Sequence, residues 1–465
     1  MSLIFSHFPL SLFTKQNIFI RFSSSSKAKK LLKNYKFPQI LPNDCEEQYI
    51  RGWGPGGSCV NSASNAVLLK HKPSGCTVKV HQSRVLRENV KIAYERLKVF
   101  FLRMSSNFSN NFIFQDVLNP RDSAKWIAKN TDSNLIKLNE MAVVKVAEKI
   151  CNSTISQLDD LNFGECEFQP KNADKEAVDW IFFVDTINFS FWENDENRHW
   201  EITHKGTTQS GYFGLCQAVN RAIEKGIPLT SAHYMANIDE KKMEEIFQGD
   251  NDIPLSMLNE RLEMIRENGK ILNEKFQGSF YNCILKCSKS AVKLLELIFE
   301  NFPNFRDFAD YHGRKVSFLK RAQILVADIY SCLLGKDSNA DFYDINTLTM
   351  FADYRVPQAL AYLGVLEYGN VIMELLSNNK LIKCNSEEEV QIRGFSIEAC
   401  ELILAEIKKI INSPAKNNLI NPEVLKRLNK FNSIDVDVWL WLWRRKNAEE
   451  IELKIPFHKC RSIFY

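Results

Sequence analysis

Four stretches of the chain combine aromatic rings and carboxylates more densely than a hydrophobic core requires, at 185–192, 318–328, 350–358 and 434–443. A charge inside an apolar run costs free energy unless it is paired or used. Aromatic faces stack on flat heterocycles, and carboxylates accept hydrogen bonds from the N–H edge of a base or stabilise a cation. The pattern therefore indicates a pocket for a nucleobase. Helix capping and hydrogen bonds within a core are the alternative for each carboxylate taken singly.

The elements that must position these stretches are mainly helices. Apolar residues recur at helical spacing over 290–299, 317–334 and 396–411. The apolar run 180–184 fits either a strand or a buried helix, because pattern alone does not separate the two. No alternating series of strands and helices follows it. The sequence therefore predicts a mainly α fold for this region, with at most a minor sheet.

Composition excludes several classes of protein. The 465 residues carry a formal net charge of +4 and 45% of them are hydrophobic, which is typical of a folded globular chain. No apolar run reaches the roughly 18 residues of a membrane-spanning helix, so no membrane contact is expected. The 12 cysteines form no CxxC pair, and neither a metal-ligand cluster nor a nucleotide-cofactor loop is evident. We expect free thiols, no metal site and no cofactor.

Charge and composition divide the chain into four segments. No acidic residue precedes Asp44, and the basic, serine-bearing leader has the composition of a mitochondrial transit peptide, with a secretory signal as the alternative. We expect a mitochondrial or cytoplasmic location. The predicted segments are the leader at 1–43, a small module at 44–104, a Ser- and Asn-rich linker at 105–114 and a large module at 115–465.

The small module opens with a glycine-rich loop, 52–58, whose backbone can approach another molecule closely. Short strands are predicted at 66–69 and 77–80, and a helix at 89–101. Lysines and arginines give the module a basic surface suited to phosphate backbones. We therefore expect a small α+β module with a surface for nucleic acid.

This arrangement resembles the catalytic domain of class I peptide-chain release factors, especially the small mitochondrial ones that lack codon-reading domains. The likeness covers nearly all of 46–98, and its main carriers are Gly54 to Gly57, Asn61, Val67 to His71 and Asn89. The family motif ends in Gly-Gly-Gln, where the glutamine is the hallmark of peptidyl-tRNA ester hydrolysis. This chain has Ser58 at that place. The resemblance therefore implies ribosome or tRNA binding by this module rather than hydrolysis.

The large module resembles the queuosine salvage protein family, the queuosine 5′-phosphate N-glycosidases. The likeness extends over essentially all of 115–465. Among its carriers are 185–192, 218–222, 320–328, 351–358 and 456–458. Membership implies hydrolysis of the N-glycosidic bond of queuosine 5′-monophosphate, which frees queuine for salvage into tRNA. It also implies a fold similar to the helix-hairpin-helix DNA glycosylases.

The same resemblance implies a catalytic carboxylate. In the DNA glycosylases an Asp within a Val-Asp-x-x-x-Trp stretch stabilises the sugar cation, and Asp437 followed by Trp441 matches that spacing. We therefore expect Asp437 to be catalytic, with Asp353 as the alternative. The transition state of such a reaction resembles an oxocarbenium ion, so a preorganised carboxylate beside C1′ lowers its free energy.

The other candidates bind substrate. Phe351 is expected to stack on the deazaguanine ring, and Lys320 or Arg355 to hold the 5′-phosphate as a cation. Asp353 would accept hydrogen bonds from N–H groups of the base. The predicted substrate-binding set is Phe351, Tyr354, Trp441, Lys320, Arg355 and Asp185.

The chain departs from the family pattern at two positions. Family members carry a second Asp after the Trp, where this chain has Leu442, and a His near the position of Cys166. The alternative function is a ribosome- or tRNA-binding release or rescue factor, whose large module binds a nucleotide without turning it over.

Overall fold

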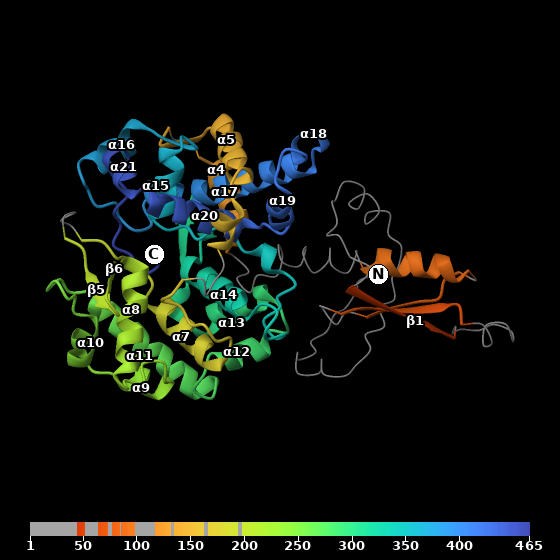
Figure 1. Cartoon of the computed structure of the whole chain (residues 1–465), viewed down its shortest axis with the longest axis horizontal. Helices are drawn as coiled ribbons and strands as arrows, with labels where there is room; N and C mark the ends of the chain where they lie inside the picture. Colours follow the sequence, from red (N-terminus) through yellow and green to blue (C-terminus); the bar gives the residue numbers. More distant parts are fainter. Residues whose placement is uncertain are drawn as a thin grey trace. The chain divides into compact units, whose positions relative to one another are not determined.

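The computed structural model describes residues 44–51, 64–72, 77–83, 85–97, 117–131, 134–161, 166–193 and 198–465. The predicted leader, the glycine-rich loop with Ser58, Asn61 and the predicted linker lie outside the described residues. The chain divides into two compact units, 1–111 and 112–465 (Figure 1). Each unit has its own hydrophobic core.

The small unit combines an antiparallel sheet with a helix, in agreement with the α+β expectation. Its strands are β1 (Cys45–Ile50), β2 (Ala66–His71) and β3 (Thr77–Val80), in the order β1-β2-β3. Val67 and Leu69 of the central strand are fully buried and pack in one core with Ala93 and Leu97 of the helix 86–97. The predicted strands at 66–69 and 77–80 and the predicted helix are therefore found, with the helix starting earlier than predicted. The strand β1 was not predicted.

A buried asparagine joins the sheet to this helix. The Oδ1 atom of Asn89 accepts from the N–H groups of Gln82 and Ser83, each at 2.9 Å. Its Nδ2 atom donates to the carbonyl oxygens of Asn65 and Ser83, each at 2.7 Å. These four hydrogen bonds fix where the helix begins relative to the ends of β2 and β3.

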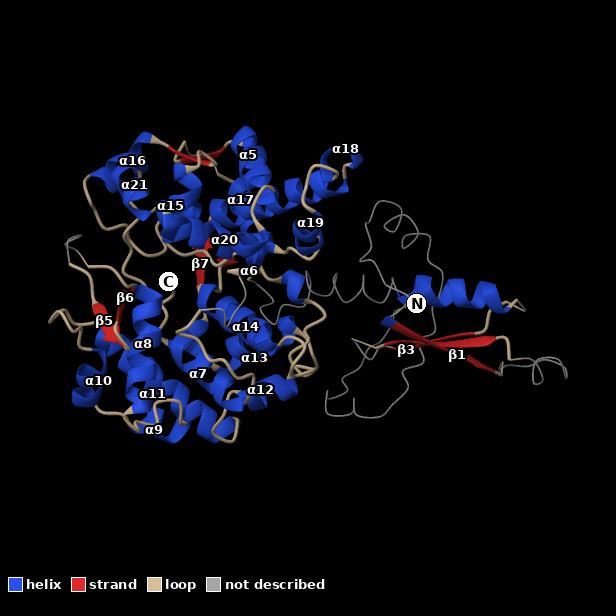
Figure 2. Cartoon of the chain, viewed as in Figure 1, coloured by secondary structure: helices blue, strands red, loops and turns tan. Residues whose placement is uncertain are grey.

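The large unit is mainly helical, as predicted, and its strands form two-stranded ladders (Figure 2). Its helices up to residue 301 are α4 (Pro120–Lys129), α5 (Glu140–Cys151), α6 (Ile155–Asp159), α7 (Lys175–Thr186), α8 (Gly211–Glu224), α9 (Ala232–Asn237), α10 (Glu240–Phe247), α11 (Leu258–Lys275), α12 (Tyr281–Lys286) and α13 (Ala291–Asn301). The later ones are α14 (Lys320–Leu333), α15 (Arg355–Tyr362), α16 (Asn370–Ser377), α17 (Glu387–Asn412), α18 (Pro414–Asn417), α19 (Pro422–Leu428), α20 (Ser433–Lys446) and α21 (Ala448–Lys454). Within the described ranges no helix has the length and apolarity to cross a membrane.

The minor sheets are short antiparallel pairs. They are β4 (Ile136–Leu138) with β9 (Leu366–Tyr368), β5 (Glu201–His204) with β6 (Thr207–Ser210), and β7 (Phe308–Tyr311) with β8 (Arg314–Ser317). Two 3-10 turns, η3 (Pro303–Phe305) and η4 (Ile345–Thr347), complete the regular structure. The hairpin of β7 and β8 ends directly before α14, so it sets where that helix starts.

The ambiguous run 180–184 lies in α7. Asp174 caps this helix by accepting from the N–H of Ala177 at 2.9 Å. All residues from Ala177 to Thr186 are buried, so the helix shows no polar face in its sequence. This complete burial explains why the pattern did not separate a helix from a strand.

The longest helix, α17, organises one half of the large unit. Ser386 caps its start, and Glu387 and Glu388 lie in its first turn, where carboxylates complement the helix dipole. It contacts α4, α5, α15 and α20. Figure 1 shows this group on one side of the unit and α7, α8, α11, α13 and α14 on the other, with the C-terminal end of the chain between them.

The segment 455–465 is held to both groups of helices. The N–H of Ile382, ahead of α17, donates to the carbonyl oxygen of Lys459 at 2.8 Å. The N–H of Ser190, beyond α7, donates to the carbonyl oxygen of Tyr465 at 3.2 Å. Tyr465 is only 1% exposed, so this segment is part of the folded core rather than an external strand.

Candidate active site

The predicted catalytic carboxylate lies in the second turn of α20. This helix starts at a capping box in which the Asn432 side chain accepts from the N–H of Ile434 at 2.8 Å, and Asp435 accepts from the N–H of Asn432 at 2.9 Å. Asp437 is 5% exposed, and its Oδ1 atom accepts from the N–H of Phe351 at 3.0 Å. This hydrogen bond joins α20 to the loop that precedes α15.

The second carboxylate, Asp353, ends that loop. Its Oδ1 atom accepts from the N–H groups of Arg355 and Val356, both at 2.9 Å, at the start of α15. A carboxylate at this end of a helix receives free backbone N–H donors and a favourable helix dipole. Asp353 is half-buried. The two N–H groups therefore hold this carboxylate in one orientation through Oδ1 and leave Oδ2 without a bond to them.

The cation between the carboxylates is Lys320, the first residue of α14. Its backbone N–H donates to Oδ2 of Asp307 at 3.0 Å, which caps the helix. Its side chain is 5% exposed, and Nζ donates to the carbonyl oxygen of Asn188 at 3.2 Å. The carboxylates of Asp353, Asp185 and Asp437 all act on the charge of this ammonium group. Four segments far apart in sequence, namely the end of α7, the start of α14, the loop before α15 and α20, thus bring Lys320 and the predicted carboxylates together.

Burial controls how these groups hold protons. It raises the pKa of the Asp437 carboxyl well above its usual range, and the neighbouring Asp353 adds to the rise. Burial also raises the pKa of Asp353, against the lowering effects of Lys320 and of the two N–H donors. For Lys320, burial lowers the pKa while the carboxylates raise it. A site with these opposing effects resembles the perturbed carboxyl groups of catalytic centres.

Asp185, at the end of α7, is fully buried. Its Oδ1 atom accepts from Nδ2 of Asn188 at 3.2 Å, and its Oδ2 atom lacks a hydrogen-bond partner among the described residues. Burial raises the pKa of this carboxyl to about 7, against the effects of Asn188 and Lys320. Asp328 of α14 lies within electrostatic range, and burial together with Asp185 raises its pKa well above the usual value. The two carboxyls add a second acidic pair to the site.

Asp328 was not among the predicted site residues, although it ends one of the stretches singled out in the sequence. Lys320, Ile324 and Asp328 follow one another at intervals of four along α14. Residues with that spacing share one helix face. From this spacing alone, Asp328 could have been predicted as a site residue together with Lys320.

The predicted aromatic residues lie around the carboxylates. Phe351 is buried directly beside Asp437, to which its backbone donates. Trp441 is one turn beyond Asp437 on α20, and its ring meets those of Phe213 and Tyr212 edge-on, at 5.5 Å and 6.4 Å between centroids. Both of these partners belong to the first turn of α8 and were not predicted. The half-buried rings of Trp441, Tyr212 and Phe213 therefore border the acidic residues.

A buried arginine that sequence reasoning missed fixes the loop and the start of α14 to each other. The Nη atoms of Arg393 donate to the two carboxylate oxygens of Asp307 at 2.8 and 2.6 Å, and Nη1 also donates to Glu389 at 3.3 Å. Its Nε atom donates to the carbonyl oxygen of Ala352 at 2.9 Å. Because Asp307 also caps Lys320, one ion pair positions Lys320 and Asp353 relative to each other.

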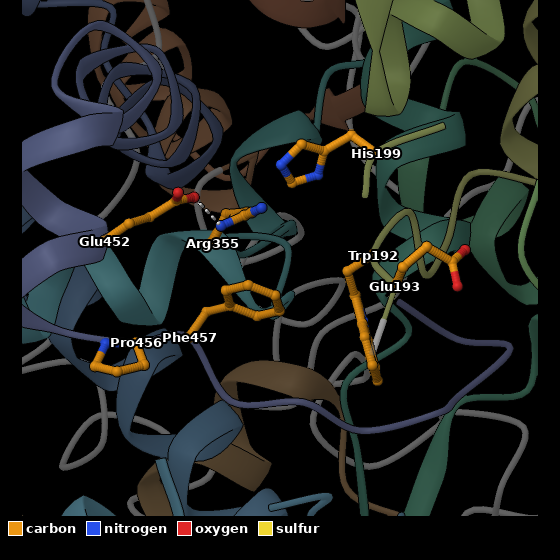
Figure 3. A pocket seen from close by; sticks show the side chains of 7 residues that line it. All are labelled: Trp192, Glu193, His199, Arg355, Glu452, Pro456 and Phe457. Atoms are coloured by element: carbon orange, nitrogen blue, oxygen red, sulfur yellow. Dashed lines mark hydrogen bonds and ion pairs between the residues drawn. The ribbon is translucent and has the colours of Figure 1, made fainter. Parts of the chain in front are cut away.

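Arg355 differs from Lys320, because its side chain is partly exposed and borders a recess that is partly open to solvent (Figure 3). Its Nη1 atom lies 3.0 Å from Oε1 of Glu452, and its guanidinium stacks 4.2 Å from the centroid of Phe457. The guanidinium also lies 5.2 Å from the ring centroid of Tyr354, whose ring is 5.2 Å from that of Phe457. The Tyr354 hydroxyl accepts from the N–H of Phe191 at 3.4 Å. The recess is lined by Trp192, Glu193, His199, Arg355, Glu452, Pro456 and Phe457.

The structure therefore brings together Asp185, Lys320, Phe351, Asp353 and Asp437, with Trp441 beside them. Tyr354 and Arg355 follow Asp353 directly; Arg355 borders the recess, and Tyr354 is buried against Phe457. Among the described residues no group of three or more His, Cys, Asp and Glu side chains is arranged to hold a metal ion. The arrangement can stabilise a cation at a carbon atom and receive a flat, hydrogen-bonding ring.

Comparison with known proteins shows the family of the chain. A family profile described as queuosine salvage protein matches residues 168–465. The chain belongs to the queuosine salvage protein family. A second profile, described as RF-1 domain, matches residues 34–117. The two resemblances inferred from the sequence are thereby confirmed, the first for most of the large unit and the second for the small one.

Relatives within the queuosine salvage family are similar over their whole length. A protein of Bos taurus is 42% identical over 351 residues, which cover 75% of this chain and 99% of the relative. A protein of Mus musculus is 39% identical over 356 residues, with the same coverage of both chains. Both are named queuosine 5′-phosphate N-glycosylase/hydrolase.

The small unit has relatives of another kind. A Homo sapiens protein named mitochondrial translation release factor in rescue is 48% identical over 72 residues, or 14% of this chain and 43% of the relative. The chain therefore spans less than half the length of that protein. The likeness concerns the small unit only.

Proposed function

We propose that residues 112–465 hydrolyse the N-glycosidic bond of queuosine 5′-phosphate, which yields queuine and ribose 5-phosphate. The observation that carries this proposal is the group formed by buried Asp437 and Lys320 and half-buried Asp353, beside the rings of Phe351 and Trp441. The substrate follows from the relatives, whose printed names specify queuosine 5′-phosphate. The reaction needs only water and the substrate.

Asp437 is proposed as the catalytic carboxylate, with Asp353 as the alternative. When the bond from C1′ to the base breaks, both bonding electrons leave with the base and positive charge develops on the ribose. A buried anion is poorly stabilised in the free site. It therefore gains more from a cation forming beside it than a solvated carboxylate would, and this difference lowers the barrier. Water then adds to C1′, a carboxylate accepts its proton, and this proton passes to the departed base, which is released as neutral queuine.

The base is proposed to lie against Phe351 and Trp441, with its N–H groups directed at acidic side chains. Asp353 keeps one oxygen free of the backbone donors at the start of α15. Asp185 keeps its Oδ2 atom free among the described residues. Both carboxyls thus retain acceptors for a ring that carries several donors.

Lys320 is proposed to act on the carboxylates rather than on the phosphate. Its ammonium group is nearly inaccessible and is surrounded by Asp185, Asp353 and Asp437. Its charge favours the ionised forms of the carboxyls, against their burial. Of the two cations expected to hold the phosphate, Arg355 is the one that borders an open recess.

The decisive experiment measures queuine release from queuosine 5′-phosphate by the purified full chain. We expect Asp437→Asn to lower kcat by about a hundredfold or more, because it removes the charge but keeps an acceptor for the N–H of Phe351. The matched control is Asp435→Asn on the same helix, which keeps the capping geometry and should retain kcat. Binding of queuine without any turnover by the wild type would instead support the alternative function.

For the small unit we propose contact with ribosomal RNA or tRNA, and a mitochondrial location. This proposal is supported by the likeness to a mitochondrial release factor in rescue and by exposed Lys70, Arg87 and Lys91. Phosphate contacts by such residues weaken with salt. Co-sedimentation of the full chain with mitochondrial ribosomes should fall on charge reversal at Lys70 and Lys91 and be unaffected by reversal at Lys409 in the large unit. Imaging of the tagged chain tests the location.

A further inference from the structure

We propose that Cys384 and Cys460 form a reversible modification site, at which a peroxide joins the two thiols in a disulfide bond. Both cysteines are free thiols in the structure. The bond ties the C-terminal segment 455–465 covalently to the turn that precedes α17. Its formation is independent of the proposed hydrolysis, because neither cysteine belongs to the residues assigned to the substrate or to catalysis.

The backbone brings the two cysteines together. Leu381 pairs with Lys459 in a parallel bridge, in which the N–H of Ile382 donates to the carbonyl oxygen of Lys459 at 2.8 Å. Cys460 directly follows this bridge, and Cys384 lies three residues beyond Leu381, in the turn before α17. Backbones that pair in this way are about 4.8 Å apart, a separation that a disulfide can span.

The two side chains meet in one small cluster. Cys384 packs against the buried group that contains Cys460 and Tyr465. A hydrogen bond joins the two thiols, and Sγ of Cys384 also lies 4.0 Å from Oγ of Ser462. Because the thiols are already in contact, a disulfide needs little rearrangement of this part of the chain.

Cys384 is the more reactive thiol of the two. The hydrogen bond from Cys460 holds the pKa of the Cys384 thiol below its usual value, against the effect of burial. The same hydrogen bond, together with burial, raises the pKa of Cys460, which therefore stays protonated. Cys384 is half-buried, whereas Cys460 is 1% exposed. An accessible thiolate beside a second, sheltered thiol is typical of redox-sensitive cysteines.

Other cysteines of the large unit lack this activation. Cys166 is also half-buried, but burial raises the pKa of its thiol and outweighs the hydrogen bond from the backbone of Phe168. Burial likewise raises the pKa of Cys283 and Cys287, which lie four residues apart. A peroxide should therefore react first at Cys384.

The reaction balances with hydrogen peroxide as the oxidant. The Cys384 thiolate attacks one peroxide oxygen, the O–O bond breaks, and Cys384 becomes a sulfenic acid while hydroxide leaves. The hydroxide takes the proton of Cys460, and the Cys460 sulfur attacks the Cys384 sulfur. The S–O bond breaks, and the second hydroxide takes the proton that Cys384 had lost. Two thiols are thus oxidised by two electrons, and one peroxide is reduced to two molecules of water.

The disulfide stabilises the segment that joins the two groups of helices. Beside Cys460, Nη1 of Arg461 donates to the carbonyl oxygen of Trp192 at 2.8 Å, beyond α7. Further on, the ring of Tyr465 lies 4.3 Å from the guanidinium of Arg393 in α17. Because the cross-link closes a long loop in the unfolded chain, we expect oxidation to raise Tm by about 3–6 °C.

The test is to treat the reduced full chain with a small excess of hydrogen peroxide, block the remaining thiols with N-ethylmaleimide and map the peptides by mass spectrometry. We expect a cross-linked pair of peptides containing Cys384 and Cys460, loss of both thiols, and their full recovery with dithiothreitol. Cys384→Ser should lose the cross-link and the shift in Tm. Cys166→Ser, the matched control at another half-buried cysteine, should keep both.

In Cys460→Ser, oxidation of Cys384 should instead stop at the sulfenic acid, which dimedone traps. The proposal is overturned if both thiols remain fully alkylated after peroxide treatment, or if Cys384 becomes a sulfinic acid without a cross-link. A cross-link between other cysteines that leaves this pair reduced, or one that forms only in urea, overturns it as well. If a serine variant does not fold, the peptide map and the Tm shift of the wild type decide.

Discussion

Replacing Arg393 by methionine removes the only cation that contacts Asp307 and Glu389 among the described ion pairs. Both members of the Asp307–Arg393 pair are at most 3% exposed, so the carboxylate left behind would be buried without a counter-charge. Breaking such a pair costs about 3–5 kcal/mol. For a unit of residues 112–465 the entropy of unfolding is about 0.7 kcal/mol/K, so we expect Tm to fall by about 4–7 °C.

Activity should fall together with stability. Nε of Arg393 holds the carbonyl of Ala352, directly before Asp353, and Asp307 holds the first residue of α14. Releasing both allows Asp353 and Lys320 to shift relative to each other, and a displacement of about 1 Å commonly costs about a hundredfold in rate. We expect a lower kcat for queuine release with a smaller change in KM.

Urea unfolding followed by circular dichroism gives the free energy, and steady-state kinetics give the rate. The double variant Arg393→Met/Asp307→Asn serves as the control, since it removes one of the two charges left without a partner, the other being Glu389. Asn keeps an acceptor for the N–H of Lys320. We expect it to recover part of the lost stability. A single variant within about 1 kcal/mol of wild type would show that the ion pair does not hold the site together.

Two further predictions concern the buried carboxyl of Asp185 and the aromatic ring of Phe351. The Asp185 carboxyl has its pKa raised by burial to about 7, so in the wild type its ionisation opposes folding as pH rises from about 4 to about 7. Asp185→Asn removes this effect, so the free energy of unfolding of the variant, relative to wild type, should increase as pH rises over that interval. Urea unfolding of both proteins at pH 4.5 and 7.5 measures this difference. A difference between variant and wild type that does not change with pH would contradict the prediction. Phe351→Ala should raise KM for queuosine 5′-phosphate about tenfold through lost base stacking, worth about 1–3 kcal/mol. An unchanged KM would place the base elsewhere, and Phe342→Ala, at another buried phenylalanine, controls for lost packing.

Local pattern was sufficient for the helices predicted at 290–299, 317–334 and 396–411, but not for their ends. A helix was predicted from residue 317, yet α14 begins at Lys320. Ser317 belongs to β8 instead, and Leu319 takes a left-handed φ of 50° where the hairpin meets the helix. The apolar periodicity continues through both elements, so the sequence alone has no signal for the boundary.

Some site residues could likewise be predicted from local sequence and others could not. Asp437 was predicted from the Val-Asp-x-x-x-Trp spacing that the family resemblance supplies. Asp353 was its alternative, and both stand in stretches where carboxylates interrupt apolar and aromatic runs, a property visible in a short window. Arg393 and Asp307 were missed because their ion pair joins residues 86 positions apart, and neither has an unusual local environment. Likewise, nothing near Lys320 in sequence shows that its ammonium is buried against Asn188, 132 positions away. The role of a side chain thus depended on partners that no local window contains.

These long separations also govern the order in which the protein can assemble. The contacts of Asp437 with Phe351 and of Lys320 with Asn188 close loops of 86 and 132 residues, whereas each helix closes loops of only a few. Contacts of high sequence separation form late, because loop-closure entropy is lost before they form. During refolding from urea, helical signal should therefore return first and queuine release only after a lag. Recovered activity would then measure the formation of the native long-range contacts rather than of secondary structure.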